Sequence, residues 1–283
     1  MIYERNIKTS IGLVNISDLP PSFDNAIKNA TDKPSLAIGT TFADLWDLVF
    51  GGISYLSEKK KFKYAHKLEI FRKQLEESIN QIPTDKKIEP SVQTTAQALE
   101  NSKYCIDEDN LREMFTALIS NSMNVDYQKD AHPAFAEILK QMSPLDAEVI
   151  KVFKNSPLVG LPIGRYQLNE NGGYKTLLEN VFIDYFIPNL DACSISISSL
   201  TRLGLLKVSY SDVLLNKEAY NGFDVHPWFI LLKNKFPDKN ITIDKGIVSL
   251  TPLGRSFTRI CIPDNMNINN KHNEEVKSAT VEE

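Results

Sequence analysis

The sequence predicts a mainly α protein, with an N-terminal helical module followed by a winged-helix-like α+β module. Three observations support this fold class. Apolar residues recur every three or four positions through most of the stretch 36–142, as on the buried face of a helix. Ser143 and Pro144 then mark a helix start, after which glycine becomes more frequent. Between 195 and 260, short helical and strand-like patterns alternate.

The first module is predicted to consist of successive amphipathic helices. Their expected spans are about 64–82, 91–104, 110–123 and 133–142. Proline 83 should end the first of these helices. The acids at 107–109 suit the start of the third, because the N-terminal end of a helix attracts negative charge.

An apolar stretch at 42–56 precedes these helices, and the longer segment 36–56 that contains it could be mistaken for a membrane span. It carries Asp44 and Asp47, and each carboxylate costs about 2.5–3.5 kcal/mol on insertion at the centre of a bilayer. We therefore predict a buried helix rather than a span. The sequence leaves open whether its apolar side chains lie in the core, in a subunit interface or against a membrane surface.

The second module has the element order of a winged helix. A short helix should end at Gly204, because glycine tolerates positive φ after a helix. The remaining predicted elements are a strand at 205–210, strands at 241–243 and 247–250 around a turn at 244–246, and a closing helix from Thr251-Pro252. Residues 211–240, which include Trp228, would be an insertion in the wing. The glycine-rich part beyond Lys154 is expected to be looser, with Gly172-Gly173 as a turn.

These patterns divide the chain into four parts. They are an irregular segment at 1–35 with a short strand at 11–16, a helical domain at 36–142, a winged-helix-like domain at 143–262 and a disordered tail at 263–283.

Composition excludes several classes of protein and site. The net charge of −4 gives no overall attraction to nucleic acid. The three cysteines and four histidines are isolated, without the spacing of a metal site. We find no catalytic motif, phosphate-binding loop or targeting signal, so we expect a cytoplasmic, non-enzymatic protein with no cofactor, metal or small-molecule substrate.

Two groups of residues are candidates for contact with a partner. A dense basic cluster could meet an anionic surface, either membrane headgroups or nucleic-acid phosphates; it comprises Lys59, Lys60, Lys61, Lys63 and Lys67. The expected recognition helix of the winged-helix-like module offers Ser198, Thr201 and Arg202 to a protein or to DNA. Because that helix carries a single cation, protein docking is the better expectation there.

Several short motifs run along the chain in a fixed order. They are FADLWDLVFGGISYL (42–56), IEP (88–90), ALENSKY (98–104), LREMFTALISNSM (111–123), HPAFAEILKQMSP (132–144), LGLL (203–206) and LTPLG (250–254). This set resembles the abortive-infection alpha (Abi-alpha) family of bacteria. The resemblance implies a role in phage defence through growth arrest or death of the infected cell, and it supplies no catalytic residues.

We therefore expect an interaction protein of phage defence that binds another protein or itself. Two alternatives stay open on the sequence: a nucleic-acid-binding regulator of a prophage or defence locus, and a peripheral membrane-binding effector.

Overall fold

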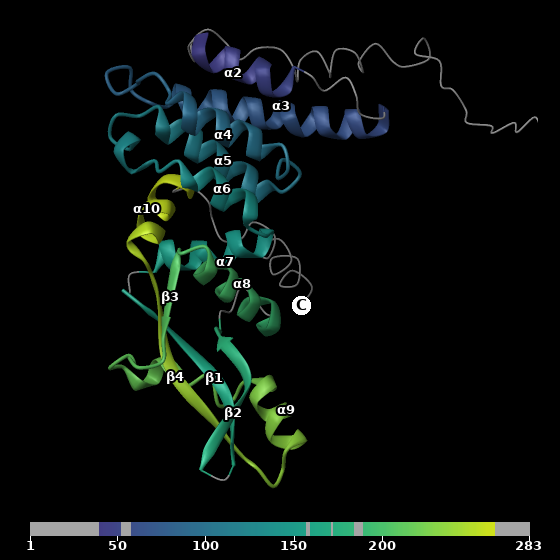
Figure 1. The fold of residues 1–283 in the computed structure, drawn as a ribbon, viewed down its shortest axis with the longest axis vertical. Helices are drawn as coiled ribbons and strands as arrows, with labels where there is room; N and C mark the ends of the chain where they lie inside the picture. The colour runs from purple at the N-terminus through teal and green to yellow at the C-terminus, as the bar shows by residue number, and fades with distance from the viewer. Residues whose placement is uncertain (1–39, 52–57, 157–158, 171, 184–188, 264–283) are drawn as a thin grey trace, which may run out of the picture.

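A computed structural model describes residues 40–51, 58–156, 159–170, 172–183 and 189–263 of the chain (Figure 1). The irregular segment expected at 1–35, its strand at 11–16 and the tail expected beyond Pro263 lie outside these residues.

The N-terminal half is built from helices stacked on one another, as the apolar spacing predicts (Figure 1). The elements are α2 (Thr40–Phe50), α3 (Glu58–Asn80), α4 (Val92–Ser102), α5 (Asp109–Ser122), the short 3₁₀ helix η4 (Gln128–Asp130) and α6 (Ala134–Gln141). The side chain of Ser91 caps α4 by accepting the backbone N–H of Thr94. The four helices expected between 64 and 142 are thereby confirmed, with ends that differ by a few residues from the predicted ones.

In the described part of the apolar stretch at 42–56, the aromatic side chains lie in the core, while Leu48 is exposed. Phe42, Trp46 and Phe50 have no exposed surface. The ring of Trp46 lies 4.5 Å from that of Phe50 and 6.0 Å from that of Phe71 on α3, measured between centroids. Since these aromatic side chains are already buried by α3, they give no reason to place the stretch in a membrane. Among the helices described, none is both long and apolar enough to cross one.

The predicted helix start at Ser143-Pro144 is confirmed as the beginning of α7 (Pro144–Asn155). Ser143 and Asp146 form a reciprocal pair in which each side chain accepts the backbone N–H of the other. The expectation of a looser segment after α7 is wrong. Strands β1 (Leu161–Glu170) and β2 (Gly173–Val181) occupy it and pair as an antiparallel hairpin. Gly172 lies in the turn between them at a φ of 80°.

The helix expected before Gly204 is α8 (Leu190–Arg202), and Gly204 has the predicted positive φ of 76°. Strand β3 (Leu206–Ser209) follows and pairs antiparallel with β4 (Asn240–Leu250), with Val208 opposite Val248. The helix expected from Thr251-Pro252 is α10 (Pro252–Cys261), capped by the Thr251 side chain.

The hairpin turn expected at 244–246 is wrong, because β4 runs through it without interruption. Arg165, Gly164 and Ile163 of β1 lie opposite these three residues in antiparallel register. The pairing with β1, a strand that the sequence pattern did not predict, supplies the hydrogen bonds that keep this segment extended.

The resulting sheet has the order β2-β1-β4-β3 and is antiparallel throughout. The order expected of a winged helix is helix, helix, strand, strand, helix; its last four members match α8, β3, β4 and α10, but β1 and β2 separate α7 from α8. These two strands enlarge the sheet, and the insertion at 211–239 forms η5 (Lys217–Tyr220) and α9 (Pro227–Lys235). The structure therefore supports a mainly α chain with a four-stranded antiparallel sheet, a coarser description than a winged helix.

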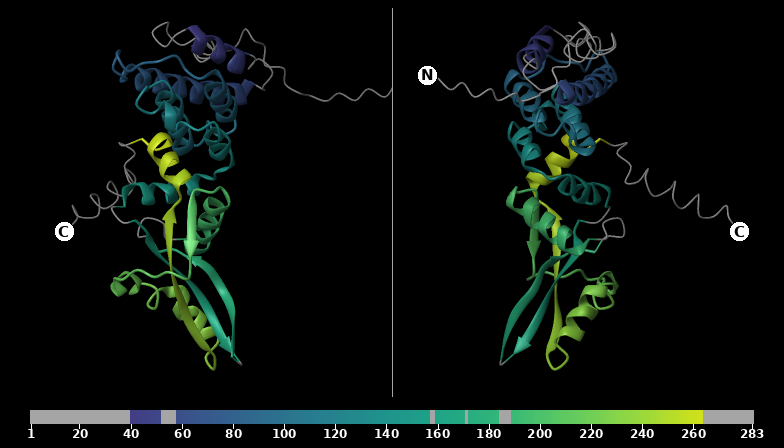
Figure 2. Two further views of the ribbon diagram at one scale, coloured as in Figure 1. Left: turned by 60° about the vertical axis from the view of Figure 1, so that its left-hand side comes forward. Right: turned by 90° about the vertical axis from the view of Figure 1, so that its right-hand side faces the viewer.

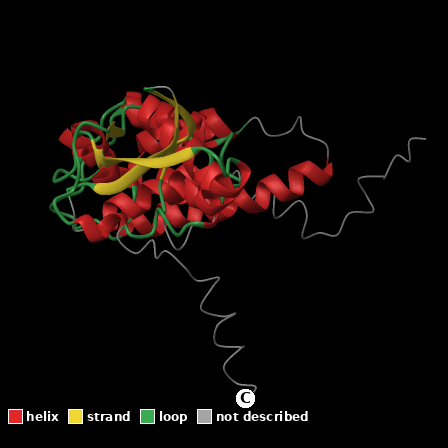
Figure 3. Cartoon of the chain, turned by 90° about the horizontal axis from the view of Figure 1, so that it is seen from below, coloured by secondary structure: helices red, strands yellow, loops and turns green. Residues whose placement is uncertain are grey.

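The molecule is elongated, with helices α2–α6 at one end and the sheet at the other (Figures 1 and 2). Seen from the sheet end, the strands lie in front of the helices (Figure 3). The main core runs from Phe42 to Ile262 without a break at 142/143, since Phe257 of α10 packs edge-on against Phe135 of α6. The predicted domain division at that point stays a prediction. A second apolar cluster fixes α9 to the sheet through Tyr166, Phe229 and other side chains.

Candidate functional site

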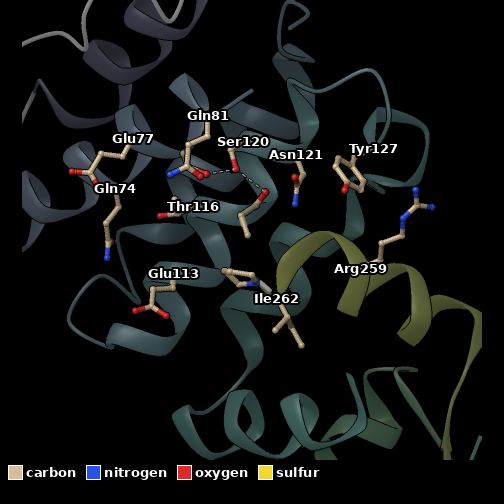
Figure 4. Close-up of a pocket in the computed structure, with 13 residues that line it drawn as sticks. Gln74, Glu77, Gln81, Glu113, Thr116, Ser120, Asn121, Tyr127, Arg259 and Ile262 are labelled. Carbon is tan, nitrogen blue, oxygen red and sulfur yellow. Dashed lines mark hydrogen bonds between the residues drawn. The ribbon is translucent and has the colours of Figure 1, made fainter. Parts of the chain in front are cut away.

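A polar cavity of about 520 Å³ opens between α3, α5 and the end of α10 (Figure 4). Its lining consists mostly of amide, hydroxyl and charged side chains. The lining residues are Gln74, Glu77, Ser78, Gln81, Glu113, Thr116, Ala117, Ser120, Asn121, Tyr127, Arg259, Ile262 and Pro263.

Several of these polar groups hold the surrounding helices together. The Ser78 hydroxyl donates to Ser120 Oγ at 2.9 Å, which joins α3 to α5. The Asn121 amide donates to the Ile260 carbonyl at 2.8 Å, which joins α5 to α10. Arg259 forms an ion pair with Asp130. Because these contacts cross between elements, the geometry is better suited to packing than to activation of a nucleophile.

Burial perturbs two charged groups near this cavity. It raises the pKa of Glu113, while the positive charges of Lys151 and Arg112 act in the opposite direction. It also lowers the pKa of the Lys151 ammonium, which donates to Asn110 Oδ1 at 2.7 Å. Among the described residues, no group of three or more His, Cys, Asp or Glu side chains is placed to hold a metal ion.

Other polar residues of the helical module line a different cavity or serve as caps. Glu100 lines a second hollow of about 530 Å³ between α4 and α6, whereas Glu113 lines the polar cavity. His132 Nδ1 accepts the backbone N–H of Ala134 at 3.1 Å and so caps the start of α6.

The predicted basic cluster is only partly described. Lys63 is exposed at the start of α3, and the side chains of Lys59, Lys60 and Lys61 lie outside the described residues. Lys67 forms an ion pair with Asp109 of α5 at 2.9 Å, which reduces the positive charge that it offers to an anionic surface. Contact of this cluster with a membrane or with nucleic acid stays a prediction.

The three polar residues predicted on the recognition helix lie on α8 with exposed side chains. Each also bonds within the chain. Ser198 Oγ accepts from the Asn180 amide at 2.9 Å. The Thr201 hydroxyl donates to the Ile197 carbonyl at 2.8 Å, and Arg202 donates to Gln141 Oε1 at 3.1 Å. A partner would have to compete with these contacts, so a contact role for these residues stays a prediction.

An apolar surface on α9 was not predicted from the sequence. Phe229 and Leu232 face the sheet and are buried. On the opposite side, Ile230 and Leu231 keep 47% and 53% of their surface exposed, and Trp228 on the adjoining flank keeps 37%. We call this surface the outer face of α9. A signal for it was available, since the run PWFILL is apolar all round a helix that should be polar on its solvent side.

The outer face has a defined geometry and charge. Pro227, Ile230, Leu231 and Asn234 follow the spacing i, i+3, i+4, i+7, so they form one stripe along the helix. Lys233 and Lys235 lie in the last turn, while the exposed Asp224 precedes the helix. The His226 side chain caps the first turn by accepting the Trp228 N–H at 3.3 Å.

Comparison with known protein families identifies a match. The family model for Abortive infection alpha covers residues 63–261, which is more than half of the chain. No curated protein and no solved structure shows significant similarity to this chain. The motifs identified in the sequence and this match agree, and the chain belongs to the Abortive infection alpha family.

Proposed function

We propose that this chain acts in phage defence by binding a protein through the outer face of α9, and that it does so without catalysing a reaction. The family supports the role in phage defence. The observation that carries the binding mechanism is the group of large apolar side chains exposed together on α9.

Exposed apolar residues are ordinary when they occur singly, but not when they are contiguous. Leu48 on α2 is 80% exposed, and Leu215 in the insertion is fully exposed; these two lie in different elements. Trp228, Ile230 and Leu231 share one short helix. Complete burial of a large apolar side chain is worth about 1.5–3 kcal/mol, and tryptophan is among the residues that most often dominate binding energy.

The outer face is also held in place before any partner binds. The Phe229 ring packs 5.1 Å from that of Tyr166 on β1, and the Tyr166 hydroxyl donates to the Phe223 carbonyl at 2.9 Å. Rigid support of this kind reduces the entropy lost on association. The helix lies beside the far end of the sheet, away from α2–α6, where a partner could reach it (Figures 1 and 2).

Phage challenge of cells that carry the gene tests this proposal. Leu231→Glu puts a charge in the middle of the outer face and should abolish protection, so that plaque counts return to those of cells without the gene. Leu48→Glu is the matched control, since it changes an exposed leucine on α2, and it should protect as well as the unchanged protein. Equal protection by both variants would remove the outer face of α9 from the mechanism.

A further inference from the structure

We infer that the protein bound by the outer face of α9 is a second copy of this chain, which packs its own α9 antiparallel against the first. This inference rests on the proposed function and names its partner. It follows from the symmetry of the stripe and from the distribution of charge along the helix.

The stripe is complementary to itself under a two-fold axis. An isologous contact brings the same surface of both copies together. An axis that crosses the contact at the level of Ile230 and Leu231 places Ile230 of one copy beside Ile230 of the other, and Leu231 beside Leu231. The same operation brings Pro227 opposite Asn234 at each end of the stripe. The apolar centre is thus covered by apolar side chains, and the polar residue lies at the edge.

Charge favours the antiparallel arrangement. The helix has Lys233 and Lys235 in its last turn and Asp224 just before its first. In an antiparallel pair, the basic end of each α9 lies near the acidic end of the other, and the two helix dipoles oppose each other. A parallel pair would bring the lysines of both copies together.

The flank of the helix adds a specific contact. Trp228 and Lys235 are seven residues apart, which places them on the same side of α9. Rotation about the two-fold axis keeps this flank on the same side in both copies. Lys235 of each copy therefore comes near Trp228 of the other, where an ammonium group can lie over the indole ring.

The contact should be weak and concentration-dependent. A nine-residue helix is only about 14 Å long, so the pair belongs to the small interfaces typical of transient association. We expect a dissociation constant in the micromolar range or weaker.

Sedimentation velocity of the full chain, at concentrations from about 1 to about 200 µM, measures this association. The mean mass of the unchanged protein should rise from 32.0 kDa toward twice that value. Leu231→Glu places two carboxylates across the axis and should stay monomeric, whereas Leu48→Glu should associate like the unchanged protein. Circular dichroism of each variant checks that it is folded.

A cross-linking experiment tests the arrangement independently. The three native cysteines are buried, so Leu231→Cys introduces an accessible thiol close to the axis. A short bis-maleimide should convert this variant to covalent dimer and leave Leu48→Cys, with its thiol on α2, as monomer. Equal cross-linking of the two variants would overturn the arrangement.

The outcomes separate this inference from the proposed function. A second copy is not the partner if the unchanged chain is monomeric at every concentration. The same conclusion follows if the Leu231→Glu variant dimerises to the same extent as the unchanged chain. Loss of protection by Leu231→Glu would then still support binding of a different protein. If Leu231→Glu abolishes the dimer but protection is unchanged, the dimer stands and the proposed function fails.

Discussion

Replacement of Asp146 should destabilise the chain more than any typical surface change, because this carboxylate joins two helices from a buried position. It is 3% exposed. Its oxygens accept the Ser143 backbone N–H at 2.9 Å, the Ser196 hydroxyl at 2.6 Å and the Ser199 hydroxyl at 3.1 Å. It therefore caps α7 and binds α8 at the same time.

The expected magnitude follows from these contacts. Loss of a helix cap costs about 0.5–2 kcal/mol, and a hydrogen bond to a charged group contributes about 1.5–3 kcal/mol. Asp146→Ala also leaves the buried Ser196 hydroxyl without its acceptor. Since such contributions are not additive, we expect a decrease of about 3–5 kcal/mol in the free energy of unfolding. The melting temperature should fall by roughly 10 °C.

Urea and thermal unfolding followed by circular dichroism measure this loss. Asp212→Ala is the matched control, because Asp212 also accepts a hydrogen bond from a serine hydroxyl, that of Ser209 at 2.7 Å, but does so on the surface. This control variant should lose no more than about 0.5 kcal/mol in the free energy of unfolding. Ser196→Ala should cost less in the Asp146→Ala background than alone, because the contact is already lost. If the two aspartate variants unfold alike, Asp146 does not tie α7 to α8.

Three further predictions concern single sites. Glu113→Gln should stabilise the protein by less than about 1 kcal/mol at neutral pH, because burial raises the pKa of Glu113 in the folded state and its ionisation therefore opposes folding. This gain in stability should vanish below about pH 4, where the carboxyl is protonated in both the folded and the unfolded state. Glu77→Gln, at the exposed rim of the cavity, is the control. A difference in urea unfolding between Glu113→Gln and the unchanged protein that does not vary with pH would contradict the reasoning. The three native cysteines should resist a thiol reagent such as Ellman's in the folded protein and react fully in denaturant, since all are buried and burial raises the pKa of two of them. Gly204→Ala should cost about 1 kcal/mol in chemical unfolding because φ is 76° there, and an unchanged midpoint would show that this conformation is not strained for alanine.

The helices could be predicted from the sequence because their signals are local. A buried face repeats every three or four residues, and a cap such as Ser143-Asp146 lies within one turn. The positive φ at Gly204 is local in the same sense, since it depends on the end of a single helix.

The sheet could not be predicted to the same extent, because its signals depend on pairing between distant segments. Asn171-Gly172 between two strand-like runs is typical of a hairpin, yet Gly160 and Gly164 around β1 suggest a loop. Gly164 fits close packing instead: a Cβ there would lie 3.0 Å from the Phe223 ring, which would have to move by a few tenths of an ångström. Once β1 is placed, β4 has a partner from Asn240 to Val248, and the local turn signal at 244–246 is overridden.

The candidate site illustrates the same limit for function. A run of lysines stands out in a sequence because charge is visible residue by residue. Its effect, however, depends on neighbours such as Asp109, which lies 42 residues from Lys67 in the chain and 2.9 Å from it in the fold. The outer face of α9 is the reverse case. Apolar residues within an insertion are expected to be buried, and only the position of Phe229 and Leu232 against the sheet determines that Ile230 and Leu231 must be exposed. A helix of nine residues cannot bury both of its faces against a single sheet. A helix with apolar residues on both faces therefore leaves one of them exposed, and this exposed face is the one that we propose as the binding surface.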